Sequence, residues 1–409
     1  MNSSSKRTKV VEFVRKYTMI IALVLVTIFF TVNTDGTMLL PSNVNNVIAQ
    51  NAYVFVLATG MLLCILTGGN IDLSVGSVVC FVGAIGAVFM VNNGMNPVLA
   101  VILMFIIGTA IGAWQAFWIA YVRIPPFIVT LSGMLIFRGL SLAVLKNGKT
   151  ISIANCKAFV KVFGGGAECY VPDFLGKMFK VGEEFEYNIT CLVFTAIAIA
   201  IYVLFTVSNR AKRVKKEYEV EKFVPWIVKM IIISVVVGAF GFRLSQHKGI
   251  PNVLLIVIAI ILFYSYITAN TTVGRYFYAV GGNEKATKLS GINTNKVYFL
   301  AYTNMGLLAA LAGMITIARL MTATAQSGQN YEMDAIASCF IGGASAYGGI
   351  GTVPGVIIGA TLMGVINLGM NTMSVAQEMQ QVVKGLVLLG AVIFDVVSKR
   401  GGKWIAKNT

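Results

Sequence analysis

The sequence predicts an all-α, polytopic helical membrane protein with about ten to twelve transmembrane helices and both termini in the cytoplasm. Of its 409 residues, 57% are hydrophobic and 12% are charged, whereas soluble domains carry about a quarter charged residues. Apolar runs recur along nearly the whole chain, each close to the roughly 20 residues that span a bilayer as a helix. Lysine and arginine concentrate in alternate loops between these runs.

Twelve apolar segments are expected to cross the membrane as helices, because a helix satisfies its own backbone hydrogen bonds in lipid. Their expected bounds are 17–32, 43–66, 74–91, 98–121, 127–145, 191–207, 225–242, 252–268, 297–318, 334–347, 353–372 and 379–397. The segment 334–347 is the shortest, and its length fits either a re-entrant element or a crossing. An even number of crossings places both termini on one side.

The basic residues show which side is cytoplasmic. With the N-terminus inside, the inner loops and termini hold twenty Lys and Arg residues and the outer loops hold eight. Positive loops favour the cytoplasm, so this orientation is preferred over the inverted one. The net charge of +16 does not indicate nucleic acid as a partner, because the basic residues flank apolar spans and have no aromatic stacking platform beside them.

We expect one transmembrane domain over residues 1–409, interrupted by polar excursions. Residues 146–190 predict a small extracytoplasmic lobe, too short to fold as an independent domain. Residues 208–224 predict a basic cytoplasmic loop that contacts the anionic lipid of the inner leaflet. Cys156 and Cys169 share the outer lobe, where a disulfide and two thiols are both compatible with the sequence.

The sequence carries no recognisable catalytic or cofactor chemistry. It has no G-x-x-x-x-G-K-[ST] phosphate cradle, and its one histidine, His247, lies in a short outer turn. No nucleophile elbow or Cys/His pairing is present. We therefore expect no enzyme activity, no cofactor and no metal. Energy for transport would come from outside the chain, since no carboxylate is placed securely at mid-span.

Small and neutral polar side chains are frequent inside the expected spans. Amides join neighbouring helices by hydrogen bonds, and they also match the hydroxyl groups of an uncharged solute. The same composition thus fits helix packing or a path for a small sugar. The candidates for a translocation path are Asn70, Asp72, Gln115, Asn304 and Asn367.

Three carboxylates near segment ends each have two interpretations. Asp72 is a path candidate, but it also fits the N-cap of a helix that starts at Leu73. Glu332 and Asp334 fit either helix caps or, on the outer face, contacts for a partner protein.

The cytoplasmic loop 274–293 predicts a short helix. Asn283 is a good N-cap, Glu284 stands in the first turn, where the helix dipole favours an anion, and Gly291 is a natural stop. So short a helix is marginal in water, so it must dock on a neighbouring loop or, preferably, on a cytoplasmic partner. The residues expected to couple to that partner are Gly282, Asn283, Glu284, Lys285, Ala286, Leu289, Ser290 and Gly291.

An ordered set of short motifs runs from about residue 43 to 397. These are 66–77 (Leu-Thr-Gly-Gly-Asn-Ile-Asp-Leu-Ser-Val-Gly-Ser), 124–131 (Ile-Pro-Pro-Phe-Ile-Val-Thr-Leu) with Arg138-Gly139, 274–280 (Gly-Arg-Tyr-Phe-Tyr-Ala-Val) leading into 281–291, 331–337 (Tyr-Glu-Met-Asp-Ala-Ile-Ala), 341–343 (Ile-Gly-Gly) with 351–353 (Gly-Thr-Val), and 381–385 (Gln-Val-Val-Lys-Gly). Together they resemble the ribose-, xylose- and galactoside-type permeases of bacterial ATP-binding-cassette (ABC) sugar importers.

The resemblance implies a passive monosaccharide pathway, multi-pass in the bacterial inner (plasma) membrane. It implies that two permease copies, most simply a homodimer, work with cytoplasmic ABC ATPase subunits and an extracytoplasmic sugar-binding protein. The helix at 284–290 would then be the coupling helix seated on the ATPase, and Glu332 and Asp334 would face the binding protein. A permease for nucleosides, amino acids or signalling sugars is an alternative, as is an ion-coupled secondary transporter.

Two features depart from the usual family pattern. Asn70 is inserted where the family reads Gly-Gly-Ile-Asp, which predicts an altered turn at that point. Residues 208–250 add a basic loop and two expected crossings, as in the longer xylose-type and multiple-monosaccharide permeases. These departures favour the long branch of the family and leave the particular sugar open.

Overall fold

The computed structural model describes residues 19–146, 148–164, 168–178, 187–220 and 222–405. The helices are Met19–Asn33, η1 (Thr37–Leu39), α2 (Pro41–Leu66), α3 (Val75–Ala87) continued by the π-helical turn η2 (Val88–Asn92), α4 (Pro97–Ala120), α5 (Pro126–Val144), α6 (Lys157–Phe163), α7 (Phe174–Met178), α8 (Ile189–Lys215), α9 (Phe223–Ser245), α10 (Asn252–Asn270), α11 (Thr272–Gly282), α12 (Glu284–Leu289), α13 (Thr294–Leu320), α14 (Tyr331–Ile341), α15 (Val353–Thr372) and α16 (Gln377–Ile405). Two short strands, β1 (Ile151–Ser152) and β2 (Thr322–Ala323), pair antiparallel.

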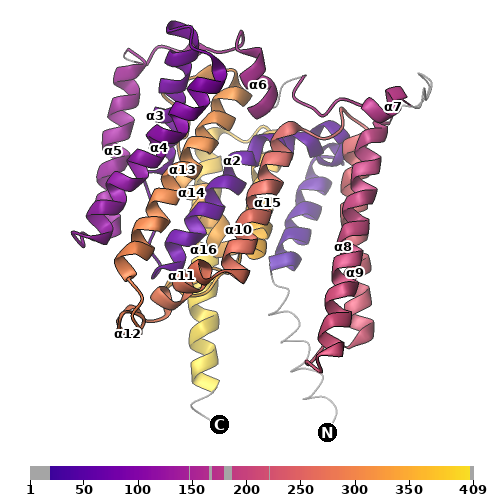
Figure 1. The fold of residues 1–409 in the computed structure, drawn as a ribbon. Coiled ribbons are helices and arrows are strands. Elements are labelled where there is room, and N and C mark those ends of the chain that lie inside the picture. The colour runs from indigo at the N-terminus through magenta and orange to yellow at the C-terminus, as the bar shows by residue number, and fades with distance from the viewer. Residues whose placement is uncertain (1–18, 147, 165–167, 179–186, 221, 406–409) are drawn as a thin grey trace.

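The predicted polytopic helical fold is confirmed. Among the described residues, nine helices are long and apolar enough to cross a membrane, and the shorter apolar helix Met19–Asn33 adds to them. The long helices run side by side as a bundle (Figure 1). The α16 helix ends at the lower end of that view, where α12 also lies, and the lobe with α6 and α7 lies at the opposite end. The basic residues identify the α12 end as cytoplasmic.

Helix α13 forms the centre of the bundle and packs closely against α4. A Cβ atom on Gly306 would lie 2.3 Å from the carbonyl oxygen of Gly108, and one on Gly112 would lie 2.6 Å from that of Tyr302. Side chains at these positions would push the two backbones apart. Small residues thus let α4 and α13 approach, as is usual for helices that associate in lipid.

The segment 334–347 crosses as a broken span, which settles the choice between a re-entrant element and a crossing. Its helix, α14, starts earlier than expected, at Tyr331, and ends at Ile341. Before it, β2 pairs with β1 at the outer lobe, while beyond it the Gly349 amide donates to the carbonyl of Leu66 at the cytoplasmic end of α2.

The non-helical part of this span is stabilised by Arg138. Its guanidinium, on α5, donates to the carbonyl oxygens of Ala325 and Ser327 at 3.0 and 3.1 Å. Backbone groups that leave a helix inside a membrane must find other partners, because lipid offers none. A charge in the middle of an expected span therefore has a structural role here.

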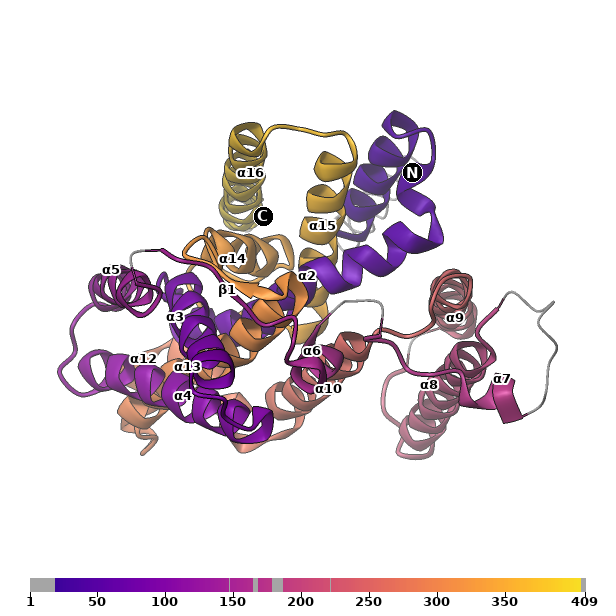
Figure 2. The ribbon, with the colours of Figure 1, turned by 90° about the horizontal axis from the view of Figure 1, so that it is seen from above.

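The outer lobe is fixed to the bundle by Asp173. Its carboxylate accepts hydrogen bonds from the backbone amides of Gly176, Ile189 and Thr190 and from the Thr190 hydroxyl. Cys156 and Cys169 are both thiols rather than a disulfide, and the Cys169 sulfur donates to the carbonyl of Val160. Beside the bundle, α8 and α9 pack mainly on each other (Figure 2).

Candidate functional site

The short helix α12 lies at the cytoplasmic end of the bundle, as the sequence predicts. The Asn283 side chain accepts a hydrogen bond from the Ala286 amide at 3.0 Å, which confirms it as the N-cap. Gly291 follows the C-cap with a φ of +84°, a left-handed conformation that favours glycine. The helix covers Glu284–Leu289, so its predicted position holds to within one residue.

Glu284 is tied to the body of the permease. Its Oε1 atom pairs with Nη1 of Arg123 at 2.7 Å, and its Oε2 atom accepts from the Tyr298 hydroxyl at 3.1 Å. Arg123 occupies the turn between α4 and α5 with a φ of +64°, stacks 5.3 Å from the Tyr298 ring centroid and donates to Thr294. One carboxylate thus joins α12 to the α4–α5 turn and to the start of α13.

The environment of Glu284 favours its ionised form. Partial burial works against the charge, but the hydrogen bonds from Arg123, Thr294 and Tyr298 outweigh it and lower the pKa of the carboxyl below its ordinary value. The carboxylate is therefore charged throughout the neutral range, and the contact with Arg123 is an ion pair.

The opposite face of α12 is open to solvent. Leu289 is 89% exposed, and the neighbouring Lys285, Ala286 and Ser290 are exposed as well, whereas Thr287 is buried. A single exposed leucine is ordinary on a protein surface, so Leu289 by itself does not identify a contact. Helix α12 therefore docks on its own chain through Glu284 and Thr287 and presents Leu289 outward.

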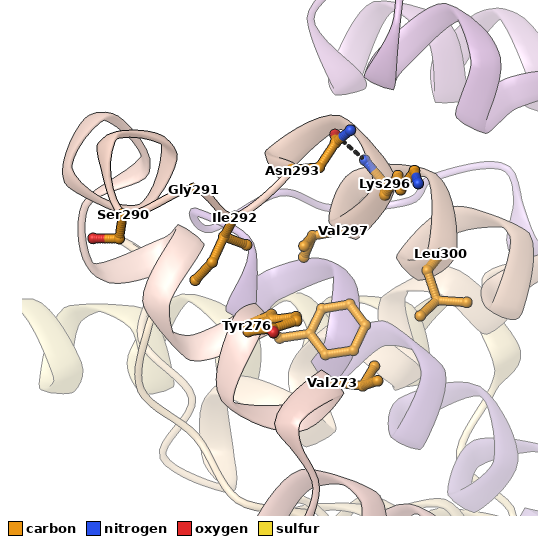
Figure 3. A pocket seen from close by; sticks show the side chains of 10 residues that line it. Val273, Tyr276, Ser290, Gly291, Ile292, Asn293, Lys296, Val297 and Leu300 are labelled. Atoms are coloured by element: carbon orange, nitrogen blue, oxygen red, sulfur yellow. Dashed lines mark hydrogen bonds between the residues drawn. The ribbon is translucent and has the colours of Figure 1, made fainter.

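A cleft of about 400 Å³ lies beside this helix, between α11 and the start of α13. Figure 3 shows the apolar side chains of Val273, Ile292, Val297 and Leu300 around Tyr276 in this cleft. Asn293 caps α13 at its rim by accepting a hydrogen bond from the Lys296 amide at 3.1 Å. The cleft and the exposed face of α12 form one cytoplasmic surface.

Helix α11 touches the ends of two membrane helices just before α12. At Gly281 the backbones are so close that a Cβ atom would lie 1.8 Å from the carbonyl oxygen of Leu66 and 2.5 Å from the Gly349 nitrogen. Leu66 ends α2, and Gly349 belongs to the loop that leads into α15. A displacement of α12 would therefore act on α2 and α15 as well as on α4, α5 and α13.

Two of the path candidates meet inside the bundle. The Gln115 amide donates to Oγ of Ser74 at 2.9 Å, and the Ser74 hydroxyl donates to Oδ1 of Asp72 at 2.7 Å. All three side chains are buried, and the space between them is too narrow for a water molecule. The interpretation of Asp72 as an N-cap is wrong, because α3 begins at Val75 and Asp72 instead bonds the Ser74 amide in the turn before the helix.

The other path candidates lie apart from this group. Asn70 donates to the backbone and side-chain oxygens of Thr67 in the turn that follows α2. Asn304 accepts a hydrogen bond from the Tyr264 hydroxyl, which joins α13 to α10. Asn367 donates to Asn51 at 3.1 Å and joins α15 to α2. The five candidates thus lie in separate places rather than along one open channel.

Glu332 and Asp334, expected as surface contacts for a partner protein, are both buried. Asp334 is 1% exposed; it pairs with Nζ of Lys384 at 3.0 Å and accepts from the Tyr53 hydroxyl at 2.6 Å. The Tyr53 ring stacks on Tyr331 with their centroids 3.5 Å apart. Asp334 therefore joins α14 to α2 and α16, and neither carboxylate offers a surface contact in this structure.

The sequence analysis did not single out several residues of these networks as site residues, among them Arg123, Tyr298 and Lys384. Arg123 follows an expected span, where a basic residue is ordinary, and Tyr298 reads as part of an apolar run. Arg123 directly precedes the motif at 124–131, and Lys384 lies within the motif at 381–385. This is the one sequence signal that could have indicated their role.

The fold is that of a multi-pass helical membrane protein, with the short helix α12 and its adjoining cleft at the cytoplasmic end of the bundle. The chain belongs to the family described as branched-chain amino acid transport system / permease component, whose model matches residues 43–164 and 179–392. As a permease component, it works within a transport system that has other subunits. No solved structure matches the chain.

Named relatives are similar over nearly the whole length of the chain. The xylose transport system permease protein of Haemophilus influenzae is 35% identical over 384 residues, which covers 94% of this chain and 96% of that protein. Its counterpart in Escherichia coli is 33% identical, with 94% and 92% covered. The ribose import permease protein of Escherichia coli is 32% identical over 367 residues, with 90% and 87% covered.

Proposed function

We propose that this chain is the monosaccharide permease of an ABC importer and forms a passive path for a pentose such as xylose or ribose. The relatives named for these two sugars support the substrate class, since they match at 32–35% identity along the whole bundle. Neutral amides and hydroxyls dominate the polar groups of the described helices, which suits an uncharged solute.

The observation that carries the proposal is the position of α12, which is docked on its own chain by one face and exposed to solvent on the other. Its Glu284 face is joined to the α4–α5 turn, and its Leu289 face is exposed to the cytoplasm. A cytoplasmic ATPase subunit seated on Leu289 and the adjoining cleft would move α12, and the ion pair and Gly281 would pass that motion to the membrane helices. An extracytoplasmic sugar-binding protein would deliver the solute at the other end.

The proposed assembly contains two copies of the permease, most simply a homodimer, in a bacterial inner membrane. The chain itself supplies no ATP site, because its sequence lacks a phosphate cradle. Exposed apolar side chains on α8 and α9 face lipid, with the basic end of α8 at the anionic inner leaflet.

Reconstitution tests this proposal. The permease would be placed in vesicles with its ATPase subunit and binding protein, and uptake of labelled xylose, ribose, a nucleoside and an amino acid would be followed. We expect pentose uptake that needs ATP and binding protein and survives collapse of the ion gradients. Uptake of the nucleoside or the amino acid alone would change the substrate assignment. Uptake that stops when the ion gradients collapse but continues without ATP would indicate a secondary transporter.

A further inference from the structure

A second cavity, of about 250 Å³, lies between α14 and the first four turns of α16, on the outer side of the bundle. Figure 2 looks down on this end, where α14 and α16 are neighbours. Its polar lining consists of five amides and one amine: Gln329, Asn330, Gln377, Gln380, Gln381 and Lys384. None of the path candidates from the sequence lines it.

The charge of this cavity is already balanced. Lys384 is held by the Asp334 carboxylate at 3.0 Å, and Asp334 itself is 1% exposed. An anion would have to compete with a buried carboxylate for the amine, and a cation would find no accessible carboxylate in the lining. Both kinds of solute would lose hydration without a matching charge, which is costly. The cavity therefore suits a neutral solute.

Amide side chains each offer donors and acceptors, so a cluster of five can pair with hydroxyl groups in several orientations. Met333 and Leu388 add apolar surface to the lining, as a site needs for the C–H face of a sugar ring. A volume of about 250 Å³ leaves room for one monosaccharide.

We propose that this amide-lined cavity between α14 and α16 is a binding site for one neutral monosaccharide on its way through the permease. The inference rests on the proposed function and locates one sugar-binding site of the transport path in this cavity. One of the amides is positioned by the fold: Gln380 donates to the Val375 carbonyl at 2.8 Å and to the Asn371 side chain at 3.0 Å. Gln377, about one turn before Gln380, and Gln381, directly after it, are exposed to an incoming solute.

Gly385 provides a direct test, because it lines the cavity and a Cβ atom there meets no atom within 4 Å. Gly385→Phe would fill the cavity without straining α16. Gly390 is the matched control, since it lies on the same helix with equally open space and does not line the cavity. In the reconstituted importer, we expect xylose uptake to fall about tenfold or more in Gly385→Phe and to stay within about twofold in Gly390→Phe.

A binding measurement on the purified permease separates this inference from the transport proposal. Gly385→Cys and Gly390→Cys would be made in a Cys156→Ser background, since the other five cysteines are buried. Labelling by an uncharged maleimide would be timed with xylose, ribose or xylonate. We expect the two neutral sugars to slow labelling at 385 about threefold or more at saturating concentration, xylonate to leave it unchanged, and none of the three to affect 390.

Each outcome bears on one claim. Unchanged labelling at 385 with xylose and ribose, or equal protection by xylonate, would overturn the assignment of the cavity. Full xylose uptake in Gly385→Phe would overturn it as well and leave the permease function standing. Protection at 385 in a permease that fails to transport any sugar in vesicles would support the cavity and count against the proposed function.

Discussion

Arg123 and Glu284 form an ion pair with a nitrogen–oxygen distance of 2.7 Å across 161 residues of sequence. The pair joins the turn between α4 and α5 to the short cytoplasmic helix α12. Both side chains are partly exposed, at 41% and 35%, so the pair adds little to global stability, on the order of 0.2–1 kcal/mol. Its importance lies in the two elements that it connects.

Breaking this pair should uncouple transport without unfolding the bundle. In Glu284→Ala and in Arg123→Ala, we expect sugar uptake and stimulated ATP hydrolysis to fall about tenfold, and the double variant to lose no more than either single one, because both remove the same interaction. Lys212→Ala is the control, since Lys212 is exposed at the end of α8, away from α12. Additive losses, or full uptake in both single variants, would show that the pair transmits nothing.

The exposed leucine of α12 should carry the contact with the ATPase. Replacement of Leu289 by Asp places a charge in a desolvated contact, and we expect binding of the ATPase subunit to weaken about tenfold or more, while the melting temperature of the isolated permease stays the same. Tyr218→Asp, in the basic cytoplasmic loop, is the matched control. Weakened binding in Tyr218→Asp and not in Leu289→Asp would move the contact to that loop.

Asp334 and Lys384 should depend on each other for stability. Asp334→Asn leaves the Lys384 ammonium without its counter-ion beside a buried site, and we expect a loss of about 3 kcal/mol in the free energy of unfolding. The double variant Asp334→Leu with Lys384→Met removes both charges and should recover more than half of that loss. Thermal unfolding in detergent measures the stability of each variant. A double variant whose loss of stability equals the sum of the losses in the two single variants would contradict the coupling.

Asp173 should hold the outer lobe on α8 in a pH-dependent way. Burial opposes its charge, but the hydrogen bonds from Thr190, Gly176 and Ile189 prevail and lower its pKa. The stabilisation is therefore present above the ordinary value of about 3.9 and is lost as pH falls through the lower folded value. Amide exchange at Ile189 and Thr190 should rise about tenfold in Asp173→Ala at neutral pH. Glu168→Ala, an exposed residue of the same lobe, should leave it unchanged.

Topology can be checked by thiol labelling in intact cells. In a Cys156→Ser background, a cysteine at Asn155 in the outer lobe should react with a membrane-impermeant reagent, and one at Lys216, at the end of α8, should react only after the membrane is opened. Both positions are exposed in the structure. Labelling in the reverse order would invert the orientation of the bundle.

The positions of the helices and of α12 were predictable from the sequence alone. A bilayer requires apolar runs of a set length, so the expected bounds 43–66 and 353–372 nearly coincide with α2 (Pro41–Leu66) and α15 (Val353–Thr372). The short helix α12 was equally accessible, because an N-cap at Asn283 and a left-handed glycine at 291 act within a few residues. These features depend on local chemistry and on the membrane.

The tertiary structure alone decided which polar groups meet. Arg123 finds Glu284 across 161 residues, Tyr53 finds Asp334 across 281, and the amides of α14 and α16 face one cavity only because the broken span brings them together. Local patterns carry no information on such distances, which is why the sequence left two interpretations open for Asp72, Glu332 and Asp334 and did not predict their buried partners. The sequence by itself determined the helices and their orientation; the packing of the bundle determined which of their side chains bind, pair or move together.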